Sequence, residues 1–182
     1  MRTIILCTLL LSLFSCHKDD MPIYQAGDME HGSLNACRNG KNWEASGTVY
    51  RYLGKVDTFG LGGSTYTEEG SWREALGIGE VPLRVGKYTV SKNPLSGGFF
   101  GKPVAGYSTM TSDGDVLEDI YLLDEDCNNY IKVTKLDTIA NKVAGYFELH
   151  FVVQQPKKGE QNSEEVYFKN GTFEVDIRLV AK

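Results

Sequence analysis

Histidine is scarce in this sequence, which has three: His17, His31 and His150. The first two lie ahead of any regular apolar pattern, so His150 is the sole candidate in the folded part for a histidine-dependent triad or a zinc site. No GxSxG, HExxH or CxxC motif accompanies it. We predict that His150 is an exposed strand residue on the face that carries Glu148. The sequence thus predicts no catalytic residue, no metal site and no cofactor, and it disfavours a hydrolase that depends on histidine.

Basic residues are outnumbered by acidic ones. Lysine and arginine together number 19 against 24 aspartates and glutamates, which gives a formal net charge of −5. A nucleic-acid-binding surface needs a basic footprint to neutralise phosphates. We therefore expect no nucleic-acid partner.

The chain also lacks an apolar run long enough to cross a membrane, which takes about 20 residues. Its longest apolar stretch, MRTIILCTLLLSLFS, covers residues 1–15, carries Arg2 as its only charge, and is followed at once by the polar sequence HKDD. A short apolar segment with a basic start is typical of a secretory signal peptide. We predict that residues 1–15 are such a signal.

A cysteine, Cys16, stands directly after this apolar segment, with Leu13 three places before it and Ser15 one place before it. This arrangement resembles the lipobox of bacterial lipoproteins, and the resemblance implies that Cys16 is acylated and becomes the new N-terminus. Because each buried methylene contributes about 0.8 kcal/mol, two or three acyl chains hold a protein stably on a bilayer. Cys16 is therefore the predicted lipidation site and membrane lipid a predicted partner.

Residues 16–32 have no sustained apolar period and are predicted to form a flexible tether. Their start, CHKDD, resembles the signal that sends Bacteroidota lipoproteins to the outer face of the outer membrane. We expect an outer-membrane, surface-exposed protein. The periplasmic face stays open as an alternative, because Asp19 and Asp20 can also serve only to solvate a linker.

Cysteine is used sparingly, with four in the chain. Cys7 leaves with the signal and Cys16 is consumed by lipid, so Cys37 and Cys127 remain in an oxidising compartment. A disulfide between them would close a loop of about 90 residues and stabilise the fold by about 4 to 5 kcal/mol. Two free thiols that behave as small apolar groups are the equal alternative.

From residue 33 onward the patterns are those of strands. Alternating apolar residues mark 142–153 and 172–179 as half-buried antiparallel strands. Weaker candidates are 48–53, 57–66, 72–79, 86–91, 104–111, 116–123 and 129–136. The segment 68–77 could instead be a short helix. We predict one all-β domain, residues 33–182, folded as an antiparallel β-sandwich, with a β-barrel as the alternative.

Three turn signals divide these strands. They are Asn39 with Gly40, Asp113 with Gly114, and Asn170 with Gly171. Both central residues of a type I′ turn need positive φ, which these residue types adopt at low cost. Each pair is therefore predicted to close a hairpin.

The domain carries short motifs at both ends. They are an NGKxW-like hairpin with flanking residues (Cys37, Asn39, Gly40, Lys41, Trp43, Ala45), a GxY step (Gly86, Tyr88), and an ending of the form IxVTKLD, GxFxL and NGxFxV (Ile131 to Asp137; Gly145, Phe147, Leu149; Asn170, Gly171, Phe173, Val175). With these motifs the chain resembles a family of uncharacterised Bacteroidota lipoproteins. The resemblance implies a shared β fold and a cell-envelope address. It implies no catalytic residue.

Acidic residues gather in DGDVLEDIYLLDEDCNN, residues 113–129. Their spacing does not match an EF-hand, so we interpret them as solvated loops rather than a calcium site. A pair of carboxylates suited to glycoside hydrolysis needs a separation of about 5 to 10 Å, which sequence does not give. A carbohydrate-active enzyme therefore stays open as an alternative function.

Aromatic residues give the main functional indication. Phe99 and Phe100 lie between glycines, and with Tyr66, Trp72 and Tyr107 they could form an exposed ligand platform. The alternative is that these rings fill the core.

A further short motif surrounds Thr138. The sequence Asp137, Thr138, Ile139 resembles the O-glycosylation site of Bacteroidota envelope proteins, which implies modification at Thr138. Taken together, the features of the chain lead us to expect a lipid-anchored, non-enzymatic envelope protein that binds a glycan or a protein. Its other alternative is a structural subunit of an outer-membrane complex.

Overall fold

The computed structural model describes residues 31–52, 57–93, 101–154 and 163–180. The signal segment, Cys16, most of the tether, Phe99 and Phe100 lie outside the described residues. Within them the chain forms strands and turns, and no helix that could cross a membrane is present there. The strands are β1 (Gly32–Arg38), β2 (Lys41–Tyr52), β3 (Thr58–Tyr66), β4 (Trp72–Pro82), β5 (Gly86–Thr89), β6 (Ser91–Lys92), β7 (Val104–Met110), β8 (Leu117–Leu123), β9 (Tyr130–Asp137), β10 (Lys142–Val153) and β11 (Glu165–Val180).

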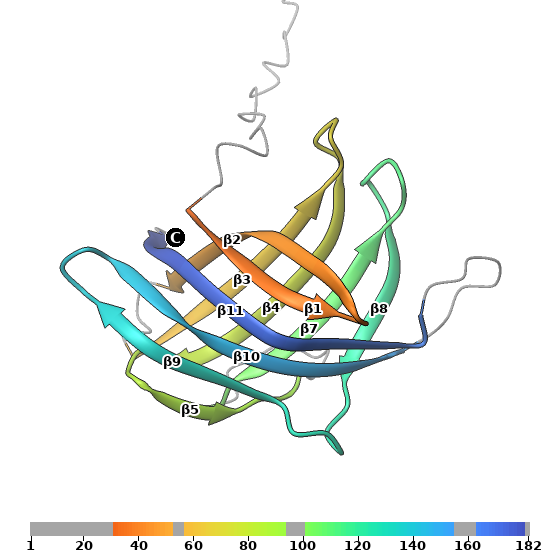
Figure 1. The fold of residues 1–182 in the computed structure, drawn as a ribbon. Coiled ribbons are helices and arrows are strands. Elements are labelled where there is room, and N and C mark those ends of the chain that lie inside the picture. The colour runs from red at the N-terminus through yellow and green to blue at the C-terminus, as the bar shows by residue number, and fades with distance from the viewer. Residues whose placement is uncertain (1–30, 53–56, 94–100, 155–162, 181–182) are drawn as a thin grey trace, which may run out of the picture.

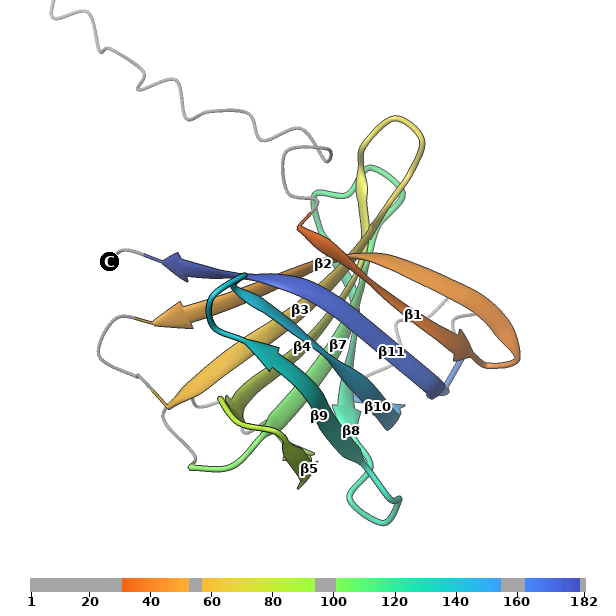
Figure 2. The same cartoon turned by 60° about the vertical axis from the view of Figure 1, so that its left-hand side comes forward.

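Eight of these strands close into an antiparallel barrel (Figures 1 and 2). The ring runs β1–β2–β3–β4–β7–β8–β10–β11 and returns to β1, each neighbour being antiparallel. Beyond the first residue of β1, the last residues of β11 pair in parallel with β2. The all-β prediction is confirmed, and of its two architectures the barrel is the one that forms, because a single sheet closes on itself instead of splitting into two layers.

Strand β10 changes its partner part-way along. Residues 142–148 pair with β9, whereas 151–153 pair with β8. Strand β5 then adds to β9 outside the ring, and β6 adds to β7. The turn that joins β8 to β9 therefore lies where β10 passes from one neighbour to the other.

The core consists of the inward-facing residues of the ring. Its centre is a group of aromatic rings: Trp43, Tyr107, Tyr121, Phe147, Phe151 and Phe168. Beside these rings Glu74 forms an ion pair with Arg38 and accepts a hydrogen bond from Trp43 Nε1 at 2.6 Å. Arg38 also donates to the hydroxyl of Tyr107 at 2.9 Å. The polar atoms of Trp43 and Tyr107 thus find partners, as buried polar groups must.

The Asn170–Gly171 pair does not close a hairpin. Both residues lie inside β11, where two residues, Lys169 and Asn170, bulge opposite a single residue of β10. Asn170 has φ 53°. The bulge shifts the alternation by one position, so that Phe168 before it and Phe173 after it both point into the core. The hairpin prediction is wrong here because the same αL preference that makes a type I′ turn also makes a bulge.

The other two turn predictions are confirmed as hairpins, but only the first is a type I′ turn. Asn39 and Gly40 have φ 48° and 81°, as a type I′ turn between β1 and β2 requires. At Asp113 and Gly114 only the glycine has positive φ, and the β7–β8 connection is longer, closed by hydrogen bonds between Thr111 and the backbone of Gly114 and Val116. The short helix considered as an alternative for residues 68–77 does not form, because residues 72–77 belong to β4.

Candidate functional site

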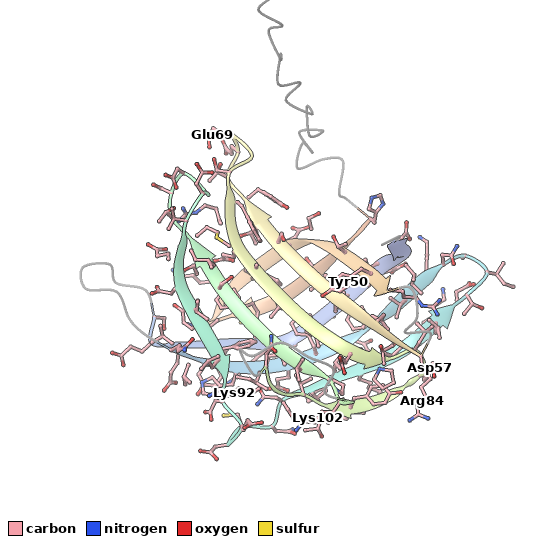
Figure 3. The ribbon with its side chains drawn as sticks, turned by 180° about the vertical axis from the view of Figure 1, so that it is seen from behind. Tyr50, Asp57, Glu69, Arg84, Lys92 and Lys102 are labelled. Carbon is pink, nitrogen blue, oxygen red and sulfur yellow. The ribbon has the colours of Figure 1, made fainter. Side chains whose placement is uncertain are left out.

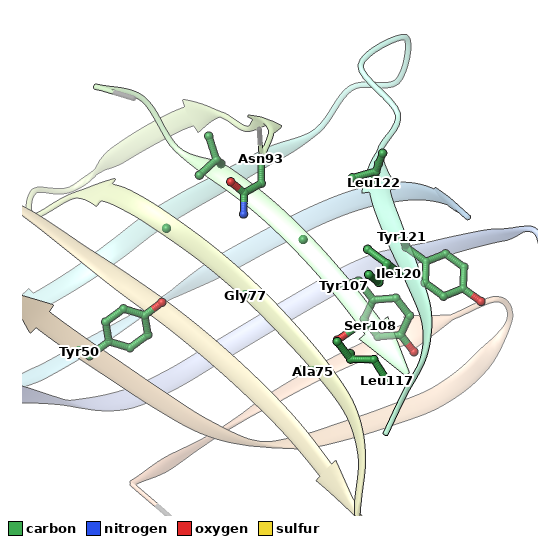
Figure 4. A pocket seen from close by; sticks show the side chains of 13 residues that line it. Tyr50, Ala75, Gly77, Asn93, Tyr107, Ser108, Leu117, Ile120, Tyr121 and Leu122 are labelled. Carbon is green, nitrogen blue, oxygen red and sulfur yellow. The ribbon is translucent and has the colours of Figure 1, made fainter. Parts of the chain in front are cut away.

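A groove runs along the outer face of β4, β7 and β8, the face that is turned toward the viewer in Figure 3. It has a volume of about 370 Å³. Its floor consists of small residues that alternate with core residues, and larger side chains form its two sides (Figure 4). We call this the outer groove; its floor is Ala75, Gly77, Gly79, Gly106 and Ser108, and its sides are Tyr50 on one flank and Leu117, Ile120 and Leu122 on the other.

Two glycines lie at the centre of the floor. Gly77 of β4 is directly opposite Gly106 of β7, and a Cβ added to either would meet no atom within 4 Å. Neither has a positive φ. The fold therefore does not need glycine at these positions, although glycine in a strand costs about 0.5 to 1 kcal/mol relative to alanine. A glycine in a strand interior often marks a place where a ligand or another backbone comes close.

The sides of the outer groove are apolar and accessible. Leu117 is 47% exposed and Ile120 is 40% exposed, an unusual state for two large aliphatic side chains of one strand. Tyr50 places its ring over Gly60 of β3 on the opposite flank. The chemistry of the groove is thus that of an apolar contact surface with few polar groups.

Of the predicted aromatic platform, the structure describes Tyr66, Trp72 and Tyr107, while Phe99 and Phe100 lie outside the described residues. Tyr107 is buried, 3% exposed, and belongs to the aromatic core, so that part of the prediction is wrong. Tyr66 and Trp72 are partners across the β3–β4 hairpin, and Trp72 is exposed. An inward position on a strand, which sequence cannot assign to Tyr107 before the register is known, is the reason for the error.

A second group of candidate site residues lies at the β8–β9 turn. Asp124 and Cys127 come from this turn and His150 from β10, at the place where β10 changes partner. The Sγ of Cys127 is 2.7 Å from His150 Nδ1, and Asp124 Oδ2 is 3.1 Å from the same nitrogen. Asp124 Oδ2 lies 3.5 Å from the Sγ. We call these three residues the cysteine–histidine cluster.

Asn129 holds the turn against β10. Its side chain donates to the carbonyl oxygens of Asp124 at 2.6 Å and Cys127 at 3.2 Å, and it accepts the backbone N–H of His150 at 2.7 Å. The backbone N–H of Asp124 donates to the carbonyl oxygen of His150 at 2.9 Å. A buried side chain thus fixes the distance between the turn and the imidazole.

The other side of the imidazole is also fixed. The His150 ring stacks on Tyr167 with centroids 3.7 Å apart and planes 12° apart. His150 Nε2, which has no hydrogen-bond partner, lies 3.6 Å from Glu165 Oε2. The Nδ1 atom therefore faces the thiol and Asp124, while Nε2 faces Glu165.

Carboxylates dominate the electrostatics of this cluster. The backbone N–H of Asp126 donates to Asp124 and lowers the pKa of that carboxyl. The thiol of Cys127 and the imidazole of His150 lower the same pKa further. Burial raises the pKa of the Cys127 thiol, and the hydrogen bond and charge of Asp124 raise it further. Near neutral pH the cluster therefore has an ionised carboxylate beside a protonated thiol.

His150 is 5% exposed, so the prediction of an exposed strand residue is wrong. The face was predicted correctly, since His150 points away from the core as Glu148 does, but the β8–β9 turn and Tyr167 cover it. In the rest of the acidic run, Glu118 and Asp119 lie within β8, and Asp119 is buried, so the interpretation as solvated loops is wrong for that residue. Among the described residues, Asp124, Cys127 and His150 are the one group of three with metal-ligand atoms close together.

Sequence reasoning missed this cluster because Cys127 and His150 are separated by 23 positions and belong to different elements. The Asp124-x-x-Cys127 spacing at the end of an apolar strand was the available signal. The structure has Cys37 and Cys127 as free thiols, so the disulfide, one of the two alternatives, is not formed. Cys37 lies on β1 opposite Asn42, while Cys127 contacts His150.

Thr138 is exposed in the turn between β9 and β10, where Asp137 accepts hydrogen bonds from the backbone N–H groups of Ile139 and Ala140 at 3.0 and 2.8 Å. Its O-glycosylation stays a prediction.

Comparisons of the chain with protein-family models, curated proteins and solved structures found no match.

Proposed function

We propose that this protein is a lipid-anchored cell-envelope binding module that uses the outer groove to hold an apolar segment of a protein partner. The anchor is Cys16, which follows the signal-like run of residues 1–15. The predicted tether, which ends where β1 begins at Gly32, would then separate the barrel from the bilayer, at the outer-membrane surface or, as the alternative, on its periplasmic side.

The single observation that carries the binding function is the pair Gly77 and Gly106. These glycines leave open space above two paired strands, although the fold would accept side chains there. Flanking apolar residues, among them Ile120 and Leu117, would cover a ligand that enters this space. Burial of apolar area contributes about 25 cal/mol per Å², so the groove gains most from an apolar occupant.

The lining favours a protein over a glycan. The floor offers one side-chain hydroxyl, that of Ser108, and the sides offer mainly aliphatic groups beside the hydroxyl of Tyr50 and the amide of Asn93. Sugars carry many hydroxyl groups, and each one that loses water without a new partner costs free energy. An extended peptide with small or apolar side chains fits such a surface better.

The anchor is tested with Cys16→Ser in the cells that make the protein. We expect the variant to keep its signal segment and to leave the detergent phase, because the acyl chains are lost. Protease treatment of intact cells then separates the outer surface from the periplasmic side. A Cys16→Ser protein that is processed and partitions as the wild type does would overturn the anchor.

The outer groove is tested with Gly106→Val, which places a β-branched side chain on its floor. Peptide arrays and glycan arrays are probed with the wild type, with Gly106→Val, and with Lys135→Val, an exposed change on β9. We expect apolar peptides to bind the wild type and Lys135→Val and to bind Gly106→Val at least ten-fold more weakly. Equal binding by all three proteins, or binding of glycans alone, contradicts the proposal.

A further inference from the structure

We propose that Asp124, Cys127 and His150 form a binding site for a divalent transition metal ion of the zinc type. The site is independent of the outer groove. Its ligands would be the Oδ2 of Asp124, the Sγ of Cys127 and the Nδ1 of His150, which all lie within 4.8 Å of one another.

The geometry of the three atoms is close to that of a metal site. Zinc binds sulfur at about 2.3 Å and nitrogen or oxygen at about 2.0 to 2.2 Å, so two ligands of a tetrahedral ion lie about 3.3 to 3.7 Å apart. The separations here are 2.7, 3.1 and 3.5 Å. The side chains need to part by less than about 1 Å to admit the ion. Because Asp124 and Cys127 come from a turn, they can make this movement while His150 stays fixed.

The surroundings of His150 are those of a metal-ligating histidine. Such a histidine usually directs its second nitrogen at a carboxylate or a carbonyl, which fixes the tautomer and raises the basicity of the ligating atom. Here His150 Nε2 is buried without a hydrogen-bond partner and lies 3.6 Å from Glu165. The stack on Tyr167 fixes the plane of the ring. Both features direct the lone pair of Nδ1 at the other two ligands.

The charges fit a divalent ion. On binding, the thiol of Cys127 gives up its proton, and the resulting thiolate and the carboxylate of Asp124 together carry two negative charges. Asp126 and Glu165 add further negative charge around the thiol. A thiolate, an imidazole and one carboxylate form a borderline-soft set that suits zinc and disfavours calcium and magnesium, which prefer oxygen ligands. Three protein ligands leave a fourth position for water, since Cys127 and Asp124 are both partly exposed.

Cobalt is the probe, because Co²⁺ takes zinc sites and its bond to a thiolate gives a charge-transfer absorption band in the near ultraviolet. The full chain, purified in detergent under reducing conditions, is titrated with Co²⁺. Four proteins are compared: the wild type, Cys127→Ser, Cys37→Ser and Glu165→Gln. Cys37→Ser is the matched control, since Cys37 is the other free thiol of the described residues.

We expect the wild type and Cys37→Ser to show the same band at about one ion per chain, and Zn²⁺ to remove it by competition. Cys127→Ser loses the band. Glu165→Gln keeps the band, but its affinity for Co²⁺ is lower by roughly ten-fold, as is typical when a residue that orients a metal-ligating histidine is changed. Because Cys127 lies on a turn, its serine variant should fold, and circular dichroism checks this.

A second readout is thermal unfolding. Zn²⁺ should raise the Tm of the wild type and of Cys37→Ser, since an ion that binds only the folded state stabilises it by mass action. It should leave the Tm of Cys127→Ser unchanged. The absence of a thiolate band in the wild type, or a band that Cys127→Ser retains, overturns the site.

Discussion

The side-chain oxygen of Asn129 accepts the backbone N–H of His150 at 2.7 Å, and this contact ties the β8–β9 turn to the strand that changes partner beside it. The same side chain donates to the carbonyl oxygens of Asp124 and Cys127. Asn129 is 2% exposed, so none of these groups would find water easily if the side chain were removed. The position of the cysteine–histidine cluster thus depends on Asn129, a residue that is not itself a member of the cluster.

Asn129→Ala should therefore lower the free energy of unfolding by about 2 to 4 kcal/mol, because it leaves a buried N–H and two carbonyl groups with fewer partners. Urea denaturation measures this change. The matched control is Asn128→Ala, an exposed neighbour, which should change stability by less than about 0.5 kcal/mol. Similar losses in both variants would show that Asn129 does not act as a clamp.

Glycines of the barrel should respond to alanine in opposite ways. A Cβ at Gly145 would lie 2.0 Å from the carbonyl oxygen of Lys132 and 2.7 Å from the ring of Phe173. Since backbone cannot move aside cheaply, we expect Gly145→Ala to cost more than about 3 kcal/mol or to prevent folding. Gly77→Ala meets no atom and should raise stability by about 0.5 to 1 kcal/mol.

Midpoints of urea denaturation for the two glycine variants and the wild type provide the measurement. A Gly77→Ala protein that is clearly destabilised would mean that the floor of the outer groove is covered within the folded chain, and the proposed binding surface would then have to be abandoned.

The bulge in β11 predicts a further pair of variants. Asn170 has φ 53°, a conformation that glycine adopts freely and that costs most other residues about 1 kcal/mol or more. Asn170→Gly should therefore leave the midpoint of denaturation within about 0.5 kcal/mol of the wild type, whereas Asn170→Val should lower stability by about 1 to 3 kcal/mol. If the valine variant were as stable as the glycine variant, the left-handed conformation would not be required there.

Much of the fold could be predicted because its signals are local. The alternation in 142–153 gave β10 with its inward face, including Phe147 and Phe151, because side chains on a strand alternate strictly. The choice between sandwich and barrel depends on closure through β10 and β11, strands that meet neighbours distant in the sequence. No local pattern records such pairings, so the barrel could be given only as an alternative.

The candidate sites were harder for the same reason. The small residues of the outer groove, such as Gly77 and Gly106, read in the sequence only as a sign of β structure, and their pairing appears once the register is known. His150 was placed on the correct face, but the turn that buries it comes from a segment about twenty residues earlier. A buried histidine on an outward face requires a covering element, which sequence does not place.

The last prediction concerns alkaline pH. Burial raises the pKa of Tyr121 to about 12, and the charge of Asp119 adds to the effect. In the unfolded chain a tyrosine loses its proton near pH 10. Above about pH 10 the unfolded state therefore binds fewer protons than the folded state, so the free energy of unfolding contributed by Tyr121 is intact below pH 10 and falls as the pH rises toward about 12.

Tyr121→Phe cannot ionise, so this part of the alkaline loss should disappear. Near neutral pH the variant should be less stable by about 0.5 to 1.5 kcal/mol, since the hydroxyl of Tyr121 donates to the carbonyl oxygen of Ser163 at 3.0 Å. The wild type should therefore lose its advantage in the free energy of unfolding above about pH 10 and become less stable than the variant before about pH 12, because a rise of about two pKa units outweighs one hydrogen bond. Denaturation curves at several pH values measure it. A difference that stays constant across this range would mean that Tyr121 ionises equally easily in both states, and the burial of its hydroxyl would then have no electrostatic consequence.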